Sequence, residues 1–234
     1  MANSKIIIFD CDSTLSSIEG IDELARTAGD DVSQQIVQMT NEAMGGKIPI
    51  ESVFAKRLEI IKPSRDAVAK TGELYVQMVE PNAKQVIATL KQKGWTPFIL
   101  SAGYVQAIAP LAKYLGVESS IEAVELFFNE DGSYRDFDRD YPTTRNGGKL
   151  EVVEKLRHKF APEKIIMVGD GVSDLETKPG VDLFVGFGRY AVREKVQAEA
   201  SCYIYDFNEL LSHVFLAVPH FNYGAGVMRL KKHV

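Results

Sequence analysis

Residues 5–14 read KIIIFDCDST, an apolar run that ends abruptly in two acids. The run at residues 5–9 is continuous and mostly β-branched, which is typical of a strand buried on both faces of a parallel sheet. Asp10 and Asp12 follow it directly. In open α/β sheets, ligands bind outside the carboxyl ends of the strands. The segment therefore predicts an α/β fold with a ligand site where the first strand ends.

Similar apolar runs recur along the chain and alternate with helical patterns. Further strands are expected at residues 96–100, 164–168 and 182–185, with a shorter edge strand at 202–205. Helices are expected at residues 81–94, 105–115 and 149–160. Pro81 stands at a plausible first position of its helix. This alternation predicts an open, doubly wound parallel sheet.

Two segments interrupt the alternation. Residues 16–79 carry only amphipathic helical patterns. Because a crossover between parallel strands needs only about a dozen residues, we expect residues 16–79 to form an inserted helical cap on a core of residues 1–15 and 80–234. The alternative is that these helices pack on the sheet.

Residues 122–134, with NEDG between apolar runs, predict a β-hairpin.

The composition limits the class of protein. The 234 residues are 45% hydrophobic and 25% charged, as in globular proteins, and the formal net charge of −5 lacks the positive excess of a nucleic-acid-binding protein. Two distant cysteines, Cys11 and Cys202, exclude a disulfide framework. No segment has the pattern of a signal peptide or a membrane-spanning helix. We therefore expect a cytoplasmic protein without nucleic-acid or membrane partners.

Two acidic groups predict a metal site. Asp10 and Asp12 project into one small space, where like charges need a cation or a proton between them. In KIIMVGDGVSD, residues 164–174, Asp170 follows another strand and Asp174 comes four residues later. Alone, each group is also typical of a solvated turn or a helix cap. Together they indicate a cation, and oxygen ligands favour Mg²⁺ as the cofactor.

A second set of residues predicts an anion site. The strand at residues 96–100 runs into Ser101, Ala102 and Gly103, and Gly148-Lys149 starts a helix. A hydroxyl, backbone N–H groups and a lysine can hold a phosphate, although Lys149 alone is more typical of a solvated lysine at a helix start. Acids for a metal beside groups for an anion indicate phosphoryl transfer, with one acid as nucleophile and another as general acid–base.

The motifs DCDST, SAG, GGK and GDGVSD, in this order around a helical insertion, resemble those of the haloacid-dehalogenase-like phosphatases. The similarity is closest to the phosphoserine-hydrolysing members and extends through EGIDELA, MGGKIP and RLEIIKPSR, over residues 5–211. The resemblance implies a haloacid-dehalogenase-like core with a small helical cap. It also implies a Mg²⁺-dependent hydrolase of O-phospho-L-serine, acting through an aspartyl-phosphate in the last step of serine biosynthesis. A small phosphorylated substrate and a monomer or homodimer are expected.

The resemblance assigns catalytic roles to the strand-end residues. Asp10 would be the nucleophile and a metal ligand, and Asp12 the general acid–base, binding the metal through its backbone carbonyl. Asp170 would be the third ligand, and Asp174 would orient the metal shell or Lys149. Ser101 and Lys149 would hold the phosphoryl group and stabilise its charge.

The resemblance also implies which residues bind the amino-acid part of the substrate. Glu19 would bind the ammonium group and Arg57 the carboxylate, which suits a planar guanidinium. Alone, Glu19 is as typical of the surface, and Arg57 of an ion pair with Glu51 or Glu59. The remaining substrate-binding residues would be Met44, Gly45, Ala102, Gly103 and Ser173. Tyr104, Val105, Phe127 and Phe128 are interpreted as core and hairpin packing.

Two positions depart from the phosphoserine-specific pattern. Ile50 stands where phenylalanine is usual, and Ala102 replaces a glycine. They leave open a phosphatase or phosphotransferase for another small phosphomonoester, such as one that transfers phosphate from phosphoserine to homoserine. Another alternative is a non-enzymatic receiver-like module phosphorylated on aspartate. Receivers lack the helical insertion and need no acid at the position of Asp12, so both features argue against it.

Overall fold

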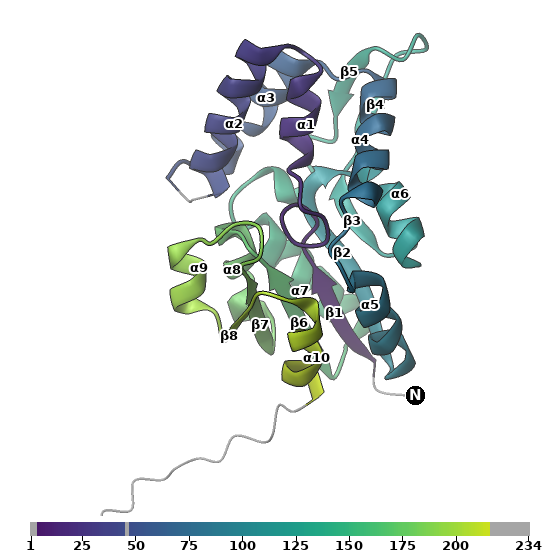
Figure 1. The fold of residues 1–234 in the computed structure, drawn as a ribbon, viewed down its shortest axis with the longest axis vertical. Helices are drawn as coiled ribbons and strands as arrows, with labels where there is room; N and C mark the ends of the chain where they lie inside the picture. Colours follow the sequence, from purple (N-terminus) through teal and green to yellow (C-terminus); the bar gives the residue numbers. More distant parts are fainter. Residues whose placement is uncertain (1–3, 45–46, 216–234) are drawn as a thin grey trace, which may run out of the picture.

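A six-stranded parallel sheet forms the centre of the protein, in the order β3-β2-β1-β6-β7-β8 (Figure 1). The computed structural model describes residues 4–44 and 47–215, without the side chain of Met44. The strands are β1 (Lys5–Phe9), β2 (Trp95–Tyr104), β3 (Ile121–Val124), β6 (Lys164–Gly169), β7 (Leu183–Phe187) and β8 (Cys202–Ile204). All five pairings between neighbouring strands are parallel. The predicted open parallel sheet, with residues 202–204 at its edge, is confirmed.

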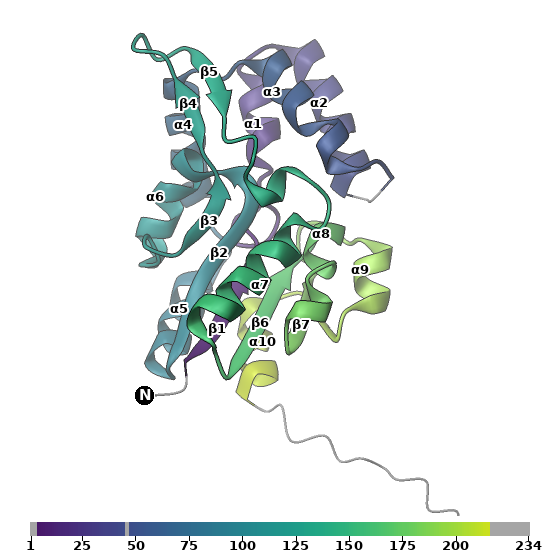
Figure 2. The ribbon, with the colours of Figure 1, turned by 180° about the vertical axis from the view of Figure 1, so that it is seen from behind.

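Helices cover both faces of the sheet, as Figures 1 and 2 show from opposite sides. Two clusters of buried apolar residues lie on opposite faces of the sheet. Ile7 and Phe9 of β1 belong to the first cluster, and Ile6 and Ile8 belong to the second. The first cluster includes α5 (Ala83–Gln92), α6 (Val105–Leu115) and α10 (Phe207–Phe215). The second includes α7 (Gly148–Phe160), α8 (Val172–Leu175) and α9 (Glu194–Glu199). The strands are therefore buried on both faces, as their continuous apolar runs predict.

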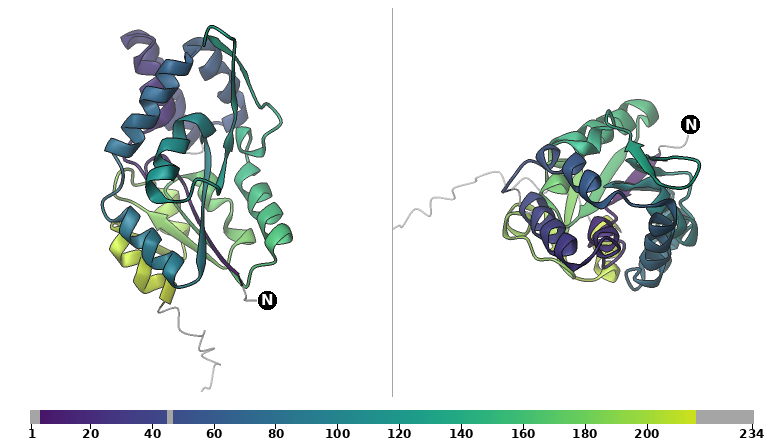
Figure 3. Two further views of the ribbon diagram at one scale, coloured as in Figure 1. Left: turned by 90° about the vertical axis from the view of Figure 1, so that its right-hand side faces the viewer. Right: turned by 90° about the horizontal axis from the view of Figure 1, so that it is seen from above.

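Four further helices lie beyond the carboxyl ends of the strands (Figures 1 and 3). They are α1 (Gly20–Arg26), α2 (Asp30–Met44), α3 (Phe54–Ile61) and α4 (Arg65–Gln77). The chain enters and leaves this segment side by side, since the Ser17 N–H donates to the Met78 carbonyl and the Glu80 N–H to the Leu15 carbonyl. The division of the chain into separate core and cap domains stays a prediction. No helix within residues 4–44 and 47–215 combines the length and apolar character needed to cross a membrane.

The β-hairpin predicted at residues 122–134 starts later in the sequence than predicted. Its strands are β4 (Leu126–Phe128) and β5 (Tyr134–Phe137), which pair antiparallel, whereas residues 122–124 belong to edge strand β3 of the main sheet. Apolar residues stand on both sides of Glu125, and no glycine or proline marks the break between the two strands. The hairpin packs beside the helical segment, where the rings of Phe54 and Phe137 lie 5.2 Å apart.

The start of α5 also differs from the prediction. The helix begins at Ala83, and Asn82 before it takes a left-handed conformation with φ of 69°. Pro81 therefore precedes the helix cap and is not the first helical residue. The other end is close to the expected one, because the last helical residue is Gln92 and Gly94 lies just beyond it.

Candidate active site

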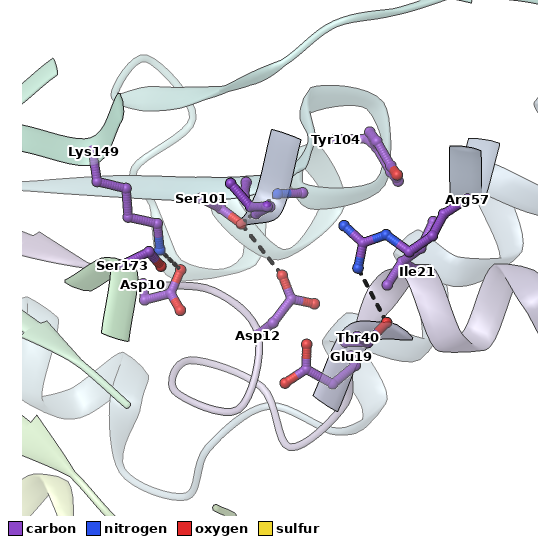
Figure 4. A pocket seen from close by; sticks show the side chains of 13 residues that line it. Asp10, Asp12, Glu19, Ile21, Thr40, Arg57, Ser101, Tyr104, Lys149 and Ser173 are labelled. Carbon is purple, nitrogen blue, oxygen red and sulfur yellow. Dashed lines mark hydrogen bonds and ion pairs between the residues drawn. The ribbon is translucent and has the colours of Figure 1, made fainter. Parts of the chain in front are cut away.

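A small pocket lies between the carboxyl ends of the strands and the helical segment (Figure 4). The core supplies Asp10, Asp12, Ser101, Ala102, Gly103, Tyr104, Lys149 and Ser173 to its lining. The helical segment supplies Glu19, Ile21, Thr40, Ile50 and Arg57. Residues separated by more than 160 positions in the sequence therefore face one space. The position agrees with the expectation that ligands bind where parallel strands end.

Three buried carboxylates lie next to the pocket. One oxygen from each of Asp10, Asp170 and Asp174 lies within 4.8 Å of the others. Lys149, in the first turn of α7, donates to Asp10 Oδ1 at 2.7 Å and to Asp174 Oδ1 at 2.6 Å. Thr14 Oγ1 and Arg193 Nε donate to the two oxygens of Asp170 at 3.3 and 3.1 Å. This set of buried oxygen donors fits a hard metal cation.

The carboxylates raise each other's affinity for protons. Burial, reinforced by the charge of Asp174, raises the pKa of Asp10 well above its usual range despite the opposing effect of Lys149. Burial and Asp174 also raise the pKa of Asp170 to about 7. Burial disfavours the charged form of Lys149, but Asp10 and Asp174 outweigh it and raise the pKa of the lysine. A divalent cation between the acids would offset the electrostatic repulsion between their negative charges.

Asp12 is held apart from these acids. Its Oδ1 accepts hydrogen bonds from the Gly20 N–H and the Tyr75 hydroxyl, both at 2.6 Å. Its Oδ2 accepts from Ser101 Oγ at 3.3 Å (Figure 4). Asp10 and Asp12 thus line one pocket, but only the carboxylate of Asp10 belongs to the acidic cluster. A carboxylate free of the cluster can exchange a proton with a ligand in the pocket.

Ser101 and Lys149 line the pocket together with Asp10. Ser101 is buried near the end of β2, three residues before Tyr104, and its Oγ accepts from the Gly103 N–H at 2.8 Å. Ser173 reaches the pocket from the start of α8. Two hydroxyl groups and one ammonium group thus line the pocket together with Asp10. These groups can hold an anion.

A second cationic group lies on the opposite side, in the helical segment. Arg57 is only 5% exposed, and one terminal nitrogen donates to Thr40 Oγ1 at 3.1 Å. Thr40 in turn donates to Asp22 Oδ1 at 2.9 Å. Arg57 Nε is buried without a hydrogen-bond partner, and no described carboxylate forms an ion pair with this arginine. The alternative pairing with Glu51 or Glu59 is therefore absent.

Glu19 lines the same pocket as Arg57 (Figure 4). Its Oε1 accepts from Ser13 Oγ at 2.7 Å. Burial, followed by the charge of Asp12, raises the pKa of Glu19 well above its usual range. The alternative of a solvated surface glutamate does not describe this environment. A cationic group in the pocket would favour the charged form of the glutamate.

The structure brings most of the predicted site residues to one place. Those that line the pocket are Asp10, Asp12, Glu19, Arg57, Ser101, Ala102, Gly103, Lys149 and Ser173. Asp170 and Asp174 lie in the acidic cluster beside it. Gly45 and the side chain of Met44 lie outside the described residues. The roles of all these residues stay predictions.

Sequence reasoning missed several groups. Tyr104, interpreted as core packing, also lines the pocket, because β2 continues to Tyr104 beyond its predicted end. The strand-end rule could have identified it. Thr40 and Tyr75 lie on faces of helices α2 and α4 that no motif marks, and Arg193 follows β7 without any recognisable pattern.

The comparisons with known proteins agree with this geometry. Residues 4–177 match a family model described as haloacid dehalogenase-like hydrolase. The chain is 37% identical to phosphoserine phosphatase of Bos taurus over 210 residues, which cover 89% of this chain and 92% of that protein. A phosphoserine phosphohydrolase-like protein from Francisella tularensis subsp. tularensis SCHU S4 is similar with a TM-score of 0.82 and 28% identity, over 90% of this chain and 99% of the other. A phospho-aspartyl intermediate analogue of phosphoserine phosphatase gives 0.78 and 26%, over 90% and 99%.

Proposed function

Because the chain belongs to the haloacid dehalogenase-like hydrolase family, we propose that its pocket hydrolyses O-phospho-L-serine to serine and phosphate. The protein is a phosphoric monoester hydrolase. The observation that carries the choice of substrate is Arg57, a buried guanidinium without a carboxylate partner in the pocket that Asp10 and Lys149 also line. A substrate with a phosphate at one end and a carboxylate at the other supplies one anion to Lys149 and another to Arg57.

The reaction needs two proton transfers and a nucleophile. An oxygen of Asp10 attacks phosphorus, the bond from phosphorus to the serine oxygen breaks, and Asp12 gives that oxygen a proton. Water then attacks the aspartyl-phosphate while Asp12 takes a proton from it, and the bond between phosphorus and Asp10 breaks. Ser101 and Lys149 hold the phosphoryl oxygens and offset their charge. The separation of Asp12 from the acidic cluster supports its role as the group that moves the proton.

The proposed metal ion is Mg²⁺, which would neutralise charge on the phosphoryl group when bound. Its proposed ligands are Asp10, Asp170 and the backbone carbonyl of Asp12. Asp174 is proposed to orient Lys149 and the metal site without binding the ion. Its Oδ1 accepts from Lys149 Nζ at 2.6 Å, which supports the role toward the lysine, and its Oδ2 accepts from the Gly171 N–H at 2.9 Å.

The amino-acid end of the substrate is proposed to lie against the helical segment. Glu19 would bind the ammonium group, and Arg57 the carboxylate with its free Nε and a terminal nitrogen. Met44, Gly45, Ala102, Gly103 and Ser173 complete the proposed substrate-binding set. The contribution of the helical segment to the pocket supports an enzyme rather than a receiver-like module.

Phosphate release from a panel of esters tests the substrate. We expect phosphoserine to be hydrolysed with a kcat/KM at least about 100-fold above that of O-phosphoethanolamine, which lacks the carboxylate, because a buried charged pair contributes several kcal/mol. An ester that keeps the carboxylate and lacks the ammonium group tests Glu19 in the same way. Equal rates for phosphoserine and phosphoethanolamine would contradict the proposal. Appearance of phosphohomoserine when homoserine is added would instead indicate a phosphotransferase.

Thermal unfolding tests the metal site independently of activity. We expect MgCl₂ to raise the midpoint of the metal-free protein, since a ligand that binds only the folded state stabilises it. Asp170→Asn should remove most of this rise, and Asp140→Asn, which changes an exposed acid, should keep it. EDTA should abolish turnover. An equal rise in both variants would contradict the assignment of Asp170 as a ligand.

The effect of MgCl₂ should also depend on pH. The pKa of Asp170 is raised from an ordinary value of 3.8 to about 7 in the metal-free protein. A raised carboxyl pKa favours the folded state at low pH, and this contribution is lost as the pH rises from about 4 to about 7. Mg²⁺ also competes with the proton for the carboxylate. The rise in midpoint is therefore expected to be larger at pH 8 than at pH 5.

A further inference from the structure

The two oxygens of the Asp12 carboxylate have different surroundings. Oδ1 accepts two hydrogen bonds of 2.6 Å, from the Tyr75 hydroxyl and the Gly20 N–H. Oδ2 faces Ser101 Oγ, at 3.3 Å, in the pocket. A backbone N–H is always a donor, and a neutral phenol can donate at the same time. Two donors therefore fix Oδ1, and Oδ2 is the oxygen of Asp12 that faces a ligand in the pocket.

The contact between Asp12 and Tyr75 depends on a close approach of α4 to the start of α1. Tyr75 is 1% exposed. A Cβ atom on Gly20 would lie 2.0 Å from the Tyr75 hydroxyl oxygen, so only glycine leaves room for the phenol at this position. Gly20 thus contributes twice: its N–H donates to Asp12, and its missing side chain admits Tyr75.

Tyr75 is also held from the side of the core. One turn earlier on α4, a Cβ atom on Gly72 would lie 2.8 Å from Pro110 Cγ of α6, so the two helices pack very closely there. Figure 1 shows α4 alongside α6. Since α6 directly follows β2, the strand that carries Ser101, the phenol and the pocket-facing serine are positioned by one connected part of the fold.

We propose that Tyr75 is a positioning residue that fixes Asp12 Oδ1 and so presents Oδ2 to the ester oxygen of the substrate. The inference rests on the proposed function, in which Asp12 is the general acid–base. Tyr75 touches neither the substrate nor the reacting atoms. Its hydroxyl acts through Asp12, whereas its ring packs in the core. Loss of the hydroxyl alone should therefore impair the transfer of a proton more than the binding of the substrate.

The test is Tyr75→Phe, which keeps the ring and removes the hydroxyl. Alkyl phosphates such as phosphoserine have a leaving oxygen that needs a proton, whereas p-nitrophenyl phosphate has one that leaves without it. We expect kcat/KM for alkyl phosphates to fall roughly 10- to 100-fold, as general acid catalysis contributes about 10²- to 10⁴-fold in total. We expect p-nitrophenyl phosphate to lose less than about threefold and the KM of phosphoserine to stay unchanged.

Tyr141→Phe is the matched control, because that hydroxyl also donates to a carboxylate at 2.6 Å, on Glu122, outside the pocket. It should leave the ratio of alkyl to aryl kcat/KM unchanged. Equal losses for both ester classes in Tyr75→Phe, or no loss, would overturn the inference. Any alkyl phosphate that the protein hydrolyses can supply the ratio, so the result stands even if phosphoserine is not the preferred substrate. Failure of the unaltered protein to hydrolyse any ester would overturn both proposals.

Discussion

Asp10→Asn is expected to lower the turnover of phosphoserine by roughly 10⁴-fold or more, the scale seen when a nucleophile is removed. An amide oxygen is too weak a nucleophile to displace the serine oxygen from phosphorus. The asparagine keeps the shape of the side chain and an oxygen for Lys149, which donates to Asp10 Oδ1 at 2.7 Å. The fold should therefore be preserved while the chemistry is lost.

The stability of this variant separates loss of chemistry from loss of structure. Burial and the charge of Asp174 already raise the pKa of Asp10, so the folded protein holds its charged form at a cost. Removing that charge relieves part of the repulsion and weakens the pairing with Lys149. These effects oppose each other, and we expect the free energy of unfolding of the metal-free protein to change by no more than about 1 kcal/mol.

Trapping experiments complete the test of Asp10. The protein is mixed with phosphoserine labelled in its phosphate, and the reaction is stopped with acid. The unaltered protein should then carry label that hydroxylamine removes, and Asp10→Asn should carry none. Asp140→Asn, an exposed acid outside the pocket, should behave as the unaltered protein. Turnover within tenfold of the unaltered protein, or equal labelling of Asp10→Asn, would mean that another residue attacks phosphorus.

The acidic side of the site could be predicted because its geometry is local. A parallel strand that ends in an acid places that acid at one known edge of the sheet, and β1 and β6 are neighbours with Phe9 paired to Val168. The positions of Asp10 and Asp170 then follow from two short motifs. Ser101 follows from the same rule applied to β2. No long-range packing detail is needed for these residues.

The groups that support these residues could not be predicted in this way. Thr40 meets Arg57 because α2 packs against α3, and Tyr75 meets Asp12 because α4 lies close to the start of α1. A helical period shows that a face is buried, but not which neighbour it meets. Thr40 and Tyr75 are therefore indistinguishable, in the sequence, from ordinary buried residues of amphipathic helices.

Arg57→Met is expected to lower kcat/KM for phosphoserine by roughly 10²- to 10³-fold, since breaking a buried charged pair costs about 3–5 kcal/mol. p-Nitrophenyl phosphate has no carboxylate for Arg57 to bind, so its kcat/KM should change less than about threefold. Methionine keeps much of the apolar stem beside Phe54, whose ring centre lies 5.9 Å from the guanidinium carbon. Thr40→Val, which removes one hydrogen-bond partner of Arg57, should show the same selectivity with a smaller loss of about three- to tenfold.

The free energy of unfolding of Arg57→Met should show whether the unpaired arginine destabilises the substrate-free protein. Without substrate, Arg57 is a buried cation whose Nε has no hydrogen-bond partner among the described residues and one of whose terminal nitrogens donates to the neutral Thr40 hydroxyl. Burying an unpaired charge is unfavourable, so Arg57→Met should leave the free energy of unfolding unchanged or raise it. Arg65→Met is the control, because Arg65 also faces an aromatic ring, that of Phe128, but is exposed and outside the pocket. Equal losses on phosphoserine and p-nitrophenyl phosphate, with lower stability, would show that Arg57 supports the fold rather than the substrate carboxylate.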